Sequence, residues 1–283
     1  SNTETGLRTE FSGKLDYSLW SAINSDADFC MGSKCPYVSQ CFYYKSKKRL
    51  LESSIIICNH HLLFVDSSAR LNDQCDYTED NVLPAFNRLV IDEAHNIERH
   101  ATSLFTREYS SYNLKRQMEH IYDVRAIGSN VRGKLLDELM PLCSDKEIYQ
   151  SIIDLFALVK ANSETLNMGA LSFLNYYKHS HLLITPKEFP YVQKELGEMA
   201  TAVIDSGLRL VSQLCTFATK INTKDELQDF RVEELKVHID RIGAIIEELR
   251  DFMKVESWND DVHYLDIVNH GQNSYVTFNI APL

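Results

Sequence analysis

The clearest pattern in the chain is an apolar stripe between residues 224 and 255. Its members recur at alternating intervals of four and three residues: Leu235, Ile239, Ile242, Ile246, Leu249 and Met253. This spacing places them on one face of an α-helix, as in the seam of packed antiparallel helices. The outer positions are acidic: Glu233, Glu234, Asp240, Glu247, Glu248 and Asp251. We therefore expect a long helix with a core-facing stripe and an outer face that repels DNA.

Helical periodicity dominates the middle of the chain. Further helices are expected near 112–124, 132–141, 146–162 and 187–221, with proline residues close to the breaks. Towards the C-terminus the period changes, because 263–268 and 275–280 are rich in β-branched and aromatic residues and flank a turn with one glycine. This pattern predicts a β-hairpin.

Two short apolar runs in the first hundred residues predict buried strands. They are Ser54–Cys58 and Leu89–Ile91, and the polar stretch 66–81 between them predicts a loop. Continuous apolar runs are typical of strands buried on both faces of a parallel sheet. We expect the C-terminal hairpin to return the chain to the sheet that holds Leu89–Ile91. The expected fold class is mainly α with a minor α/β part.

Composition and charge narrow the function classes. With 283 residues, 44% of them hydrophobic and 24% charged, the chain has the make-up of a soluble globular protein with a sizeable core. No apolar run is long enough to span a bilayer, and no signal-peptide pattern is present. The net charge of −11 argues against nucleic-acid binding by the whole surface, but it leaves room for a local basic patch.

One candidate patch lies in the helix-compatible run 42–51. Its basic and aromatic members are Tyr43, Tyr44, Lys45, Lys47, Lys48 and Arg49. Cations that follow a phosphate backbone and rings that stack on bases suit single-stranded nucleic acid. A solvated basic helix face explains the same residues equally well.

Three of the seven cysteines fall within twelve residues: Cys30, Cys35 and Cys41. Gly32 and Pro36 interrupt any regular element there, so the loop could direct several thiols at one centre. An odd number of cysteines with such a cluster favours a metal or iron–sulfur site in a reducing compartment over disulfides. Both kinds of site want four ligands. The fourth could be Cys58, Cys75, a histidine or a residue upstream of Ser1.

Residues 88–95 carry the strongest chemical signal, an apolar run followed by Asp92-Glu93-Ala94-His95. Ligands collect at the carboxyl ends of strands in open α/β sheets. There, Asp92 could hold Mg²⁺ through its retained water, and Glu93 could orient or deprotonate the water that attacks a γ-phosphate. The alternative is an acidic, solvated loop after a strand. The sequence contains no phosphate-binding G-x-x-x-x-G-K-S/T loop.

The cysteine loop, an Asn59-His60 element and this DEAH box resemble, in their order, the DinG/XPD family of iron–sulfur superfamily 2 DNA helicases. The bacterial DinG branch is the most similar. The matching stretches are Asp28–Tyr37, Cys41–Tyr44, Cys58–Leu63, Val82–Pro84 and the box with its tail Asn96–Glu98. The resemblance covers roughly the first hundred residues and the last five, and the middle matches only in position and helical character.

This resemblance implies a division into four parts. They are an iron–sulfur domain over 1–52, part of motor domain 1 over 53–98, a helical arch insertion over 99–258, and a hairpin over 259–283 that returns to motor domain 1. A 4Fe–4S cluster would be bound by four cysteines, of which Cys30, Cys35 and Cys41 are the last three. The first would precede Ser1, so we do not expect the cluster to be complete in this chain.

The implied activity is that of an ATP-dependent 5′–3′ helicase in DNA repair or replication, with ATP and Mg²⁺ at Asp92, Glu93 and His95. Asn59 and His60 would support the nucleotide site. The partners would be single-stranded, forked or displacement-loop DNA, and the protein would be a monomer in the bacterial cytoplasm, at the nucleoid, without membrane contact. Without a phosphate loop, this chain is expected to lack ATPase activity. The alternative is a helical interaction module that zinc stabilises through the three cysteines.

Overall fold

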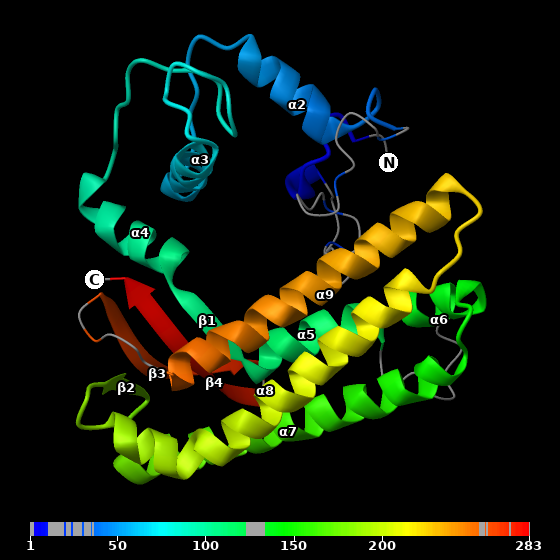
Figure 1. The fold of residues 1–283 in the computed structure, drawn as a ribbon. Helices are drawn as coiled ribbons and strands as arrows, with labels where there is room; N and C mark the ends of the chain where they lie inside the picture. Colours follow the sequence, from blue (N-terminus) through cyan, green and yellow to red (C-terminus); the bar gives the residue numbers. More distant parts are fainter. Residues whose placement is uncertain are drawn as a thin grey trace. The chain divides into compact units, whose positions relative to one another are not determined.

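The structure is a computed structural model that describes residues 3–10, 20, 24, 30, 35, 37–122, 134–254, 258, 260–271 and 273–282. It is mainly helical with one small antiparallel sheet (Figure 1), which confirms the expected mainly α class. The chain divides into two compact units, Ser1–Leu104 and Phe105–Leu283. Among the described residues, no helix combines the length and the apolar character needed to cross a membrane.

The first unit contains short helices joined by irregular segments. They are the 3₁₀ turns Arg8–Glu10 and Ala94–Asn96 and the helices α2 (Phe42–Leu51), α3 (His60–Asp73) and α4 (Ile97–Phe105). Helix α2 has the predicted bounds. The loop predicted from residue 66 is wrong in its first half, because α3 continues to Asp73 and ends where Gln74 adopts a left-handed conformation (φ 54°). An i,i+4 ion pair between Asp66 and Arg70 stabilises this part of α3.

The two predicted strands of this unit are absent. Ser54–Cys58 and Leu89–Ile91 form no strand, and Ile57 and Val90 are 95% and 94% exposed. A parallel strand depends on hydrogen-bonded neighbours, and within the described residues neither segment has one. The prediction of a sheet that carries the DEAH segment is therefore wrong for this structure.

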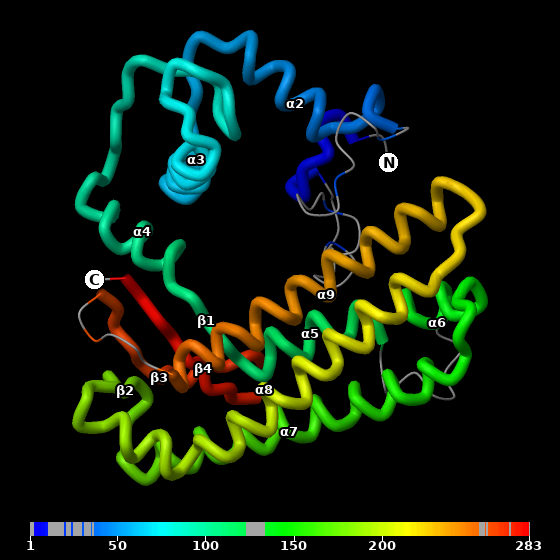
Figure 2. The backbone as a smooth tube through the Cα atoms, in the orientation of Figure 1, coloured from blue at the N-terminus to red at the C-terminus, as the bar shows by residue number. Residues whose placement is uncertain are grey.

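The second unit is built on long helices. They are α5 (Ser111–Ile121), α6 (Leu135–Leu139), the 3₁₀ turn Met140–Leu142, α7 (Glu147–Tyr177), α8 (Phe189–Thr219) and α9 (Glu226–Met253). Figure 2 shows α8 lying between α7 and α9, and it packs on both. Helix α7 runs well past the predicted end near 162, because apolar residues such as Leu166 and Phe173 continue its buried face. The α9 stripe is buried as predicted, although Phe252 takes the core position expected of Met253.

The sheet has the strand order β1-β4-β3-β2, and all its pairings are antiparallel. Its strands are β1 (Arg107–Ser110), β2 (His181–Ile184), β3 (Asp261–His270) and β4 (Asn273–Pro282). The predicted hairpin is confirmed as β3 and β4, with Gly271 at φ 65° in the turn. Its expected return to the DEAH segment is wrong, because β1 and β2 occupy the two outer edges of the hairpin.

Aromatic packing joins this sheet to the helices. The Phe278 ring lies edge-on to Tyr109 and Phe252, at centroid distances of 5.7 and 5.2 Å. The Tyr109 hydroxyl is 3.0 Å from the hydroxyl of Ser163 on α7, which supplies the partner that a buried phenol needs. Burial raises the pKa of Tyr109 above its ordinary value, so the ring stays neutral. Sheet and helices therefore share one core.

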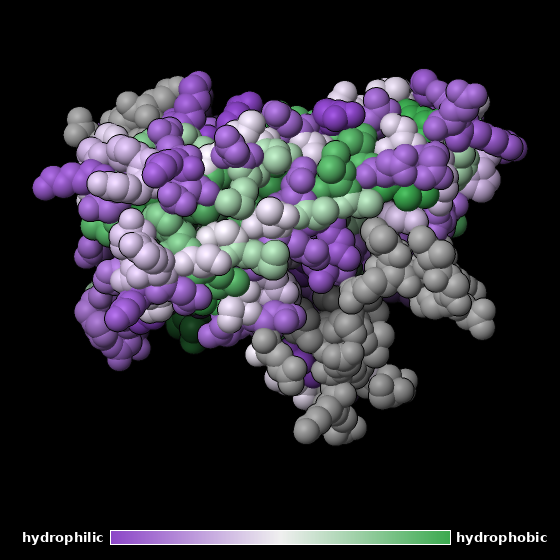
Figure 3. Space-filling model, turned by 90° about the horizontal axis from the view of Figure 1, so that it is seen from below, coloured by the Kyte–Doolittle hydropathy of each residue, from purple (hydrophilic) through white to green (hydrophobic). Residues whose placement is uncertain are grey.

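Apolar side chains also reach the surface. On the face drawn in Figure 3 they form separate patches among polar residues. Helix α7 contributes exposed apolar residues to the molecular surface at Leu158, Met168 and Tyr176. Scattered apolar residues of this kind are normal on a soluble protein and need no partner.

The contact between α8 and α9 predicts opposite effects of two glycine substitutions. A Cβ atom at Gly207 would lie 2.6 Å from Cδ1 of the fully buried Ile246, whereas one at Gly243 meets nothing within 4 Å. We expect Gly207→Ala to lower the free energy of unfolding by about 1–3 kcal/mol through overpacking. Gly243→Ala should raise it by about 0.5–1 kcal/mol through helix propensity. Urea denaturation measures both, and equal gains would contradict the close approach.

Candidate functional site

The start of α3 is tied to the DEAH segment. The Asn59 side chain accepts a hydrogen bond from the Leu62 backbone N–H at 2.8 Å and so caps the helix. The next residue, His60, places Nε2 3.1 Å from the backbone oxygen of Asp92. Its ring stacks on His100 of α4 at 5.1 Å between centroids. Of the two predicted supporting residues, His60 thus contacts the predicted magnesium residue, through its backbone oxygen, whereas Asn59 caps α3.

The DEAH residues form a tight turn. Glu93 has a left-handed backbone (φ 49°), which few residues other than glycine adopt, and its N–H donates to Oδ1 of Asp92 at 3.0 Å. His95 Nδ1 lies 3.2 Å from Oε2 of Glu93, with side chains 72% and 65% exposed. An ion pair this exposed adds little to stability. The structure therefore brings Asp92, Glu93 and His95 together on an accessible turn, as the chemistry predicted for them requires.

A buried ion pair holds the loop that precedes this turn. Arg70 Nε donates to Asp66 Oδ2 at 2.7 Å, and both side chains are almost fully buried. Asp66 accepts from the Leu83 N–H at 2.8 Å, and Arg70 donates to the Leu83 carbonyl at 2.9 Å. The guanidinium also bonds to the carbonyls of Asp76 and Glu79. The Asp66 carboxylate raises the pKa of Arg70, so the cation is fixed in its charged form.

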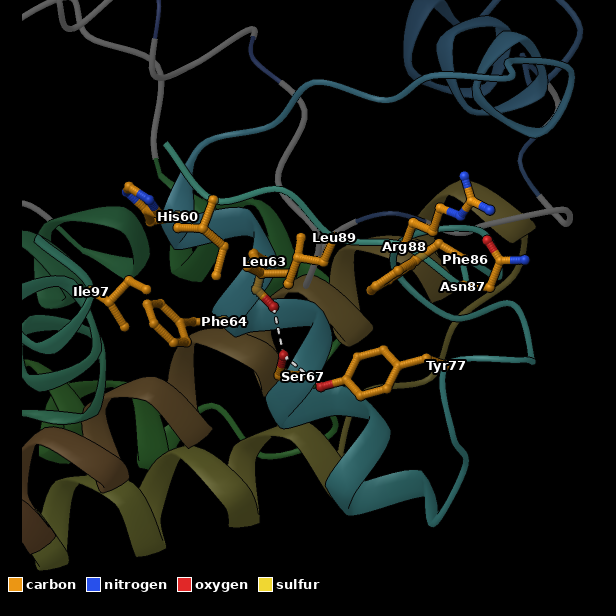
Figure 4. A pocket seen from close by; sticks show the side chains of 11 residues that line it. His60, Leu63, Phe64, Ser67, Tyr77, Phe86, Asn87, Arg88, Leu89 and Ile97 are labelled. Atoms are coloured by element: carbon orange, nitrogen blue, oxygen red, sulfur yellow. Dashed lines mark hydrogen bonds between the residues drawn. The ribbon is translucent and has the colours of Figure 1, made fainter. Parts of the chain in front are cut away.

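An apolar pocket of about 530 Å³ opens beside the same helix. Figure 4 shows Leu63 and Phe64 of α3 facing Leu89 and Ile97, with Tyr77 nearby. The Tyr77 hydroxyl lies 3.2 Å from that of Ser67. Its lining is mostly apolar, and His60, Asn87 and Arg88 are the members whose side chains carry N–H donors. Our sequence reasoning missed this pocket, although aromatic residues within the polar stretch after Asp73 were a usable signal.

The three candidate ligand cysteines differ in their exposure to solvent. Cys30 is exposed, whereas Cys35 and Cys41 are half-buried on either side of a turn. Among the residues that the structure describes, no group of three or more His, Cys, Asp or Glu side chains is arranged to hold a metal. Within the described residues, the three thiols therefore do not form a closed set of ligands by themselves.

Helix α2 presents its basic residues to solvent. None of its residues is fully buried, and Lys45, Lys48 and Arg49 are exposed. Lys45 lies 5.5 Å from the centre of the Phe42 ring, and Lys47 lies equally far from that of Tyr43, which is typical of cation–π pairs. The predicted combination of cations and rings is present on one short helix.

The class of protein follows from comparison with known families. The family model described as DEAD_2 matches residues 27–117, which include the capped start of α3, the Asp66–Arg70 pair and the DEAH turn. The chain therefore carries a DEAD_2 domain, and the resemblance to DinG-type helicases is confirmed.

More particularly, the chain is a distant partial relative of proteins named YoaA and DinG. It is 29% identical to the ATP-dependent DNA helicase YoaA of Escherichia coli over 99 residues, 35% of this chain and 15% of that protein. It is 25% identical to YoaA of Haemophilus influenzae over 148 residues, 51% of this chain and 22% of the relative. It is 30% identical to the ATP-dependent helicase DinG of Mycobacterium tuberculosis over 115 residues, which are 40% of this chain and 16% of that protein. The chain thus aligns with less than a quarter of each relative.

The buried ion pair predicts a large effect of one substitution. Arg70→Met leaves the Asp66 carboxylate buried without its cation and frees three loop carbonyls. We expect the free energy of unfolding of the first unit to fall by about 3–5 kcal/mol. Arg99→Met, at an exposed position of α4, is the control and should change it by less than about 0.5 kcal/mol. Chemical denaturation measures both. Similar values for the two variants would show that the pair does not hold the loop.

Proposed function

We propose that this chain is part of an ATP-dependent DNA helicase of the DinG type and contains one half of its nucleotide-hydrolysis site. The observation that carries the proposal is the DEAD_2 match over 27–117, because it spans both His60 and the Asp92-Glu93 turn that His60 contacts. The names of the related proteins support ATP as substrate and DNA as partner. Both belong to the whole protein, of which this chain aligns with a small part.

In this proposal the DEAH residues act by position and charge. Asp92 binds Mg²⁺ through its retained water, and Glu93 orients the water that attacks the γ-phosphate. His95 contacts Glu93 and positions it, and it links the nucleotide site to DNA or to a second motor domain. His60 and Asn59 fix the turn through the Asp92 carbonyl and the start of α3. The phosphate-binding residues come from elsewhere in the protein.

We also propose that residues 53–98 belong to motor domain 1 and that the helical residues 99–258 form the arch. Ile57 and Val90 are almost fully exposed, which is unusual for apolar side chains in a run of three. Packing against the rest of the motor domain would bury these side chains.

The basic helix α2 is the proposed DNA contact. Tyr43, Lys45, Lys47, Lys48 and Arg49 would follow single-stranded DNA at a fork or displacement loop. The acidic outer face of α9 suits no such contact. Movement from 5′ to 3′, a monomeric state and a place at the bacterial nucleoid complete the proposal, and they rest on the family resemblance.

Substitution of Glu93 tests the hydrolytic role. In the whole helicase, Glu93→Gln removes the charge that activates water and keeps the shape of the side chain. We expect the DNA-stimulated ATPase rate to fall by at least about 100-fold, with ATP binding retained. Glu98→Gln, at the start of α4, is the matched control and should keep the rate. Normal hydrolysis by the Glu93 variant would refute the assignment.

Metal analysis decides between the iron–sulfur proposal and the zinc-stabilised module. After anaerobic purification of the whole protein, we expect iron and sulfide together, held by four cysteines that include Cys30, Cys35 and Cys41. Cys35→Ser should remove most of the iron, whereas Cys215→Ser, at an exposed thiol of α8, should remove none. One tight zinc per chain without sulfide would favour the module instead.

A further inference from the structure

A second pocket, of about 370 Å³, lies wholly within the second unit. It is bounded by α5, α7 and the start of β4. Its polar lining residues are Ser111, Lys115, Lys160, Ser163, Glu164, Asn167, Asn273 and Ser274, and its apolar ones are Leu114, Met118, Leu171 and Tyr275. This size and mixture are those of a small-molecule site. Neither the DEAH turn nor helix α2 contributes to it.

The hydroxyl of Ser111 has no hydrogen-bond partner among the described residues, although this serine is only 6% exposed. It is the first residue of α5, but the capping role belongs to Ser110, whose side chain accepts from the Asn113 N–H at 3.2 Å. A buried polar group without a partner costs free energy. The Ser111 hydroxyl therefore lines the pocket as a donor that no protein group uses.

Ser163 and Asn167, two other polar residues of the wall, have partners of their own. Ser163 is bonded to the Tyr109 hydroxyl. Asn167 accepts from the Val276 N–H at 2.9 Å and donates to the Ser274 carbonyl at 3.3 Å, which fixes α7 to the start of β4. These bonds make the wall rigid, and a site on rigid elements holds a ligand in one geometry. The free donor is thus presented by a preformed wall.

Charge selects the class of ligand. Lys115 and Lys160 are both half-buried in the lining. Lys115 reaches Glu119 only at 4.0 Å, and within the described part of the chain Lys160 forms no ion pair. Glu164 is the one acid of the lining, and it is exposed. Two ammonium groups and a hydroxyl donor suit a carboxylate or phosphate, because charge-assisted hydrogen bonds are the strong ones.

We infer that this pocket binds a small organic anion, a carboxylate or phosphate on a compact apolar body. The anionic group lies between Lys115 and Lys160 and accepts a hydrogen bond from Ser111. The apolar body packs on Leu114 and Met118 of α5. The site is separate from nucleotide hydrolysis, so it stands whether or not the proposed helicase activity is correct.

Titration of the full chain with phenyl phosphate, benzoate and neutral benzyl alcohol tests this inference. We expect at least one anion to bind. The dissociation constant of benzyl alcohol should be at least about 10-fold higher, because the alcohol cannot form the charge-assisted hydrogen bonds that the anion forms. Preference for phenyl phosphate or for benzoate identifies the anionic group. Lys160→Met should weaken binding by about 10-fold or more. Lys146→Met, exposed just before α7, is the matched control and should bind like the wild type.

Ser111→Ala separates binding from folding. Because the hydroxyl has no partner, its removal should leave the melting temperature unchanged or higher, while it weakens anion binding several-fold. The inference is overturned if neither anion binds, if benzyl alcohol binds as well as the anions, or if the Lys160 variant binds like the wild type. A Ser111 variant with a clearly lower melting temperature would also overturn it, because the hydroxyl would then have an internal partner.

Discussion

The buried ion pair between Asp66 and Arg70 is the interaction on which the first unit depends. Among its described residues, only these two and Leu83 are fully buried. Asp66 binds the N–H of Leu83 and Arg70 binds its carbonyl, so one backbone unit is held from both sides. The burial of two charges is costly, and the pair is tolerated because its remaining hydrogen-bonding groups find partners in the loop. In the described part of this unit, a buried charged pair with its hydrogen bonds thus takes the place of a large apolar core.

The second unit is stabilised in the opposite way. Its long helices bury continuous apolar faces, and within them Tyr109 and Ser163 satisfy each other by a hydrogen bond. The two units therefore differ in what holds them together, one by a buried charged pair and the other by apolar helix packing. Among the described residues of the first unit, Ile57 and Val90 are apolar side chains that remain almost fully exposed.

Sequence reasoning succeeded where an element depends on local interactions and failed where it depends on residues distant in the sequence. Helix α2, the α9 stripe and the β3–β4 hairpin were predicted because local periodicity and a turn glycine define them. The strand at Leu89–Ile91 failed because strand formation depends on partners that the apolar run itself does not contain. The helical conformation of 66–73 was missed because Asp66 and Arg70, the pair that stabilises it, are charged residues in a stretch whose polar composition is typical of a loop. The DEAH residues were found from their chemistry, but the His60 contact needed the fold.

These contacts explain how a unit with few buried apolar residues in its described part can still hold the DEAH turn in place. One helix, α3, anchors the segment before the turn at two points: Arg70 and Asp66 fix Leu83, and His60 fixes the Asp92 carbonyl. Both anchors use backbone atoms of the segment, so neither of them engages the carboxylates of Asp92 and Glu93, whose own hydrogen bond and ion pair lie within the turn itself. Phosphoryl transfer relies on positioned charge more than on covalent chemistry. In the proposed helicase, an exposed turn with a fixed backbone and accessible carboxylates is therefore suited to work together with phosphate-binding groups.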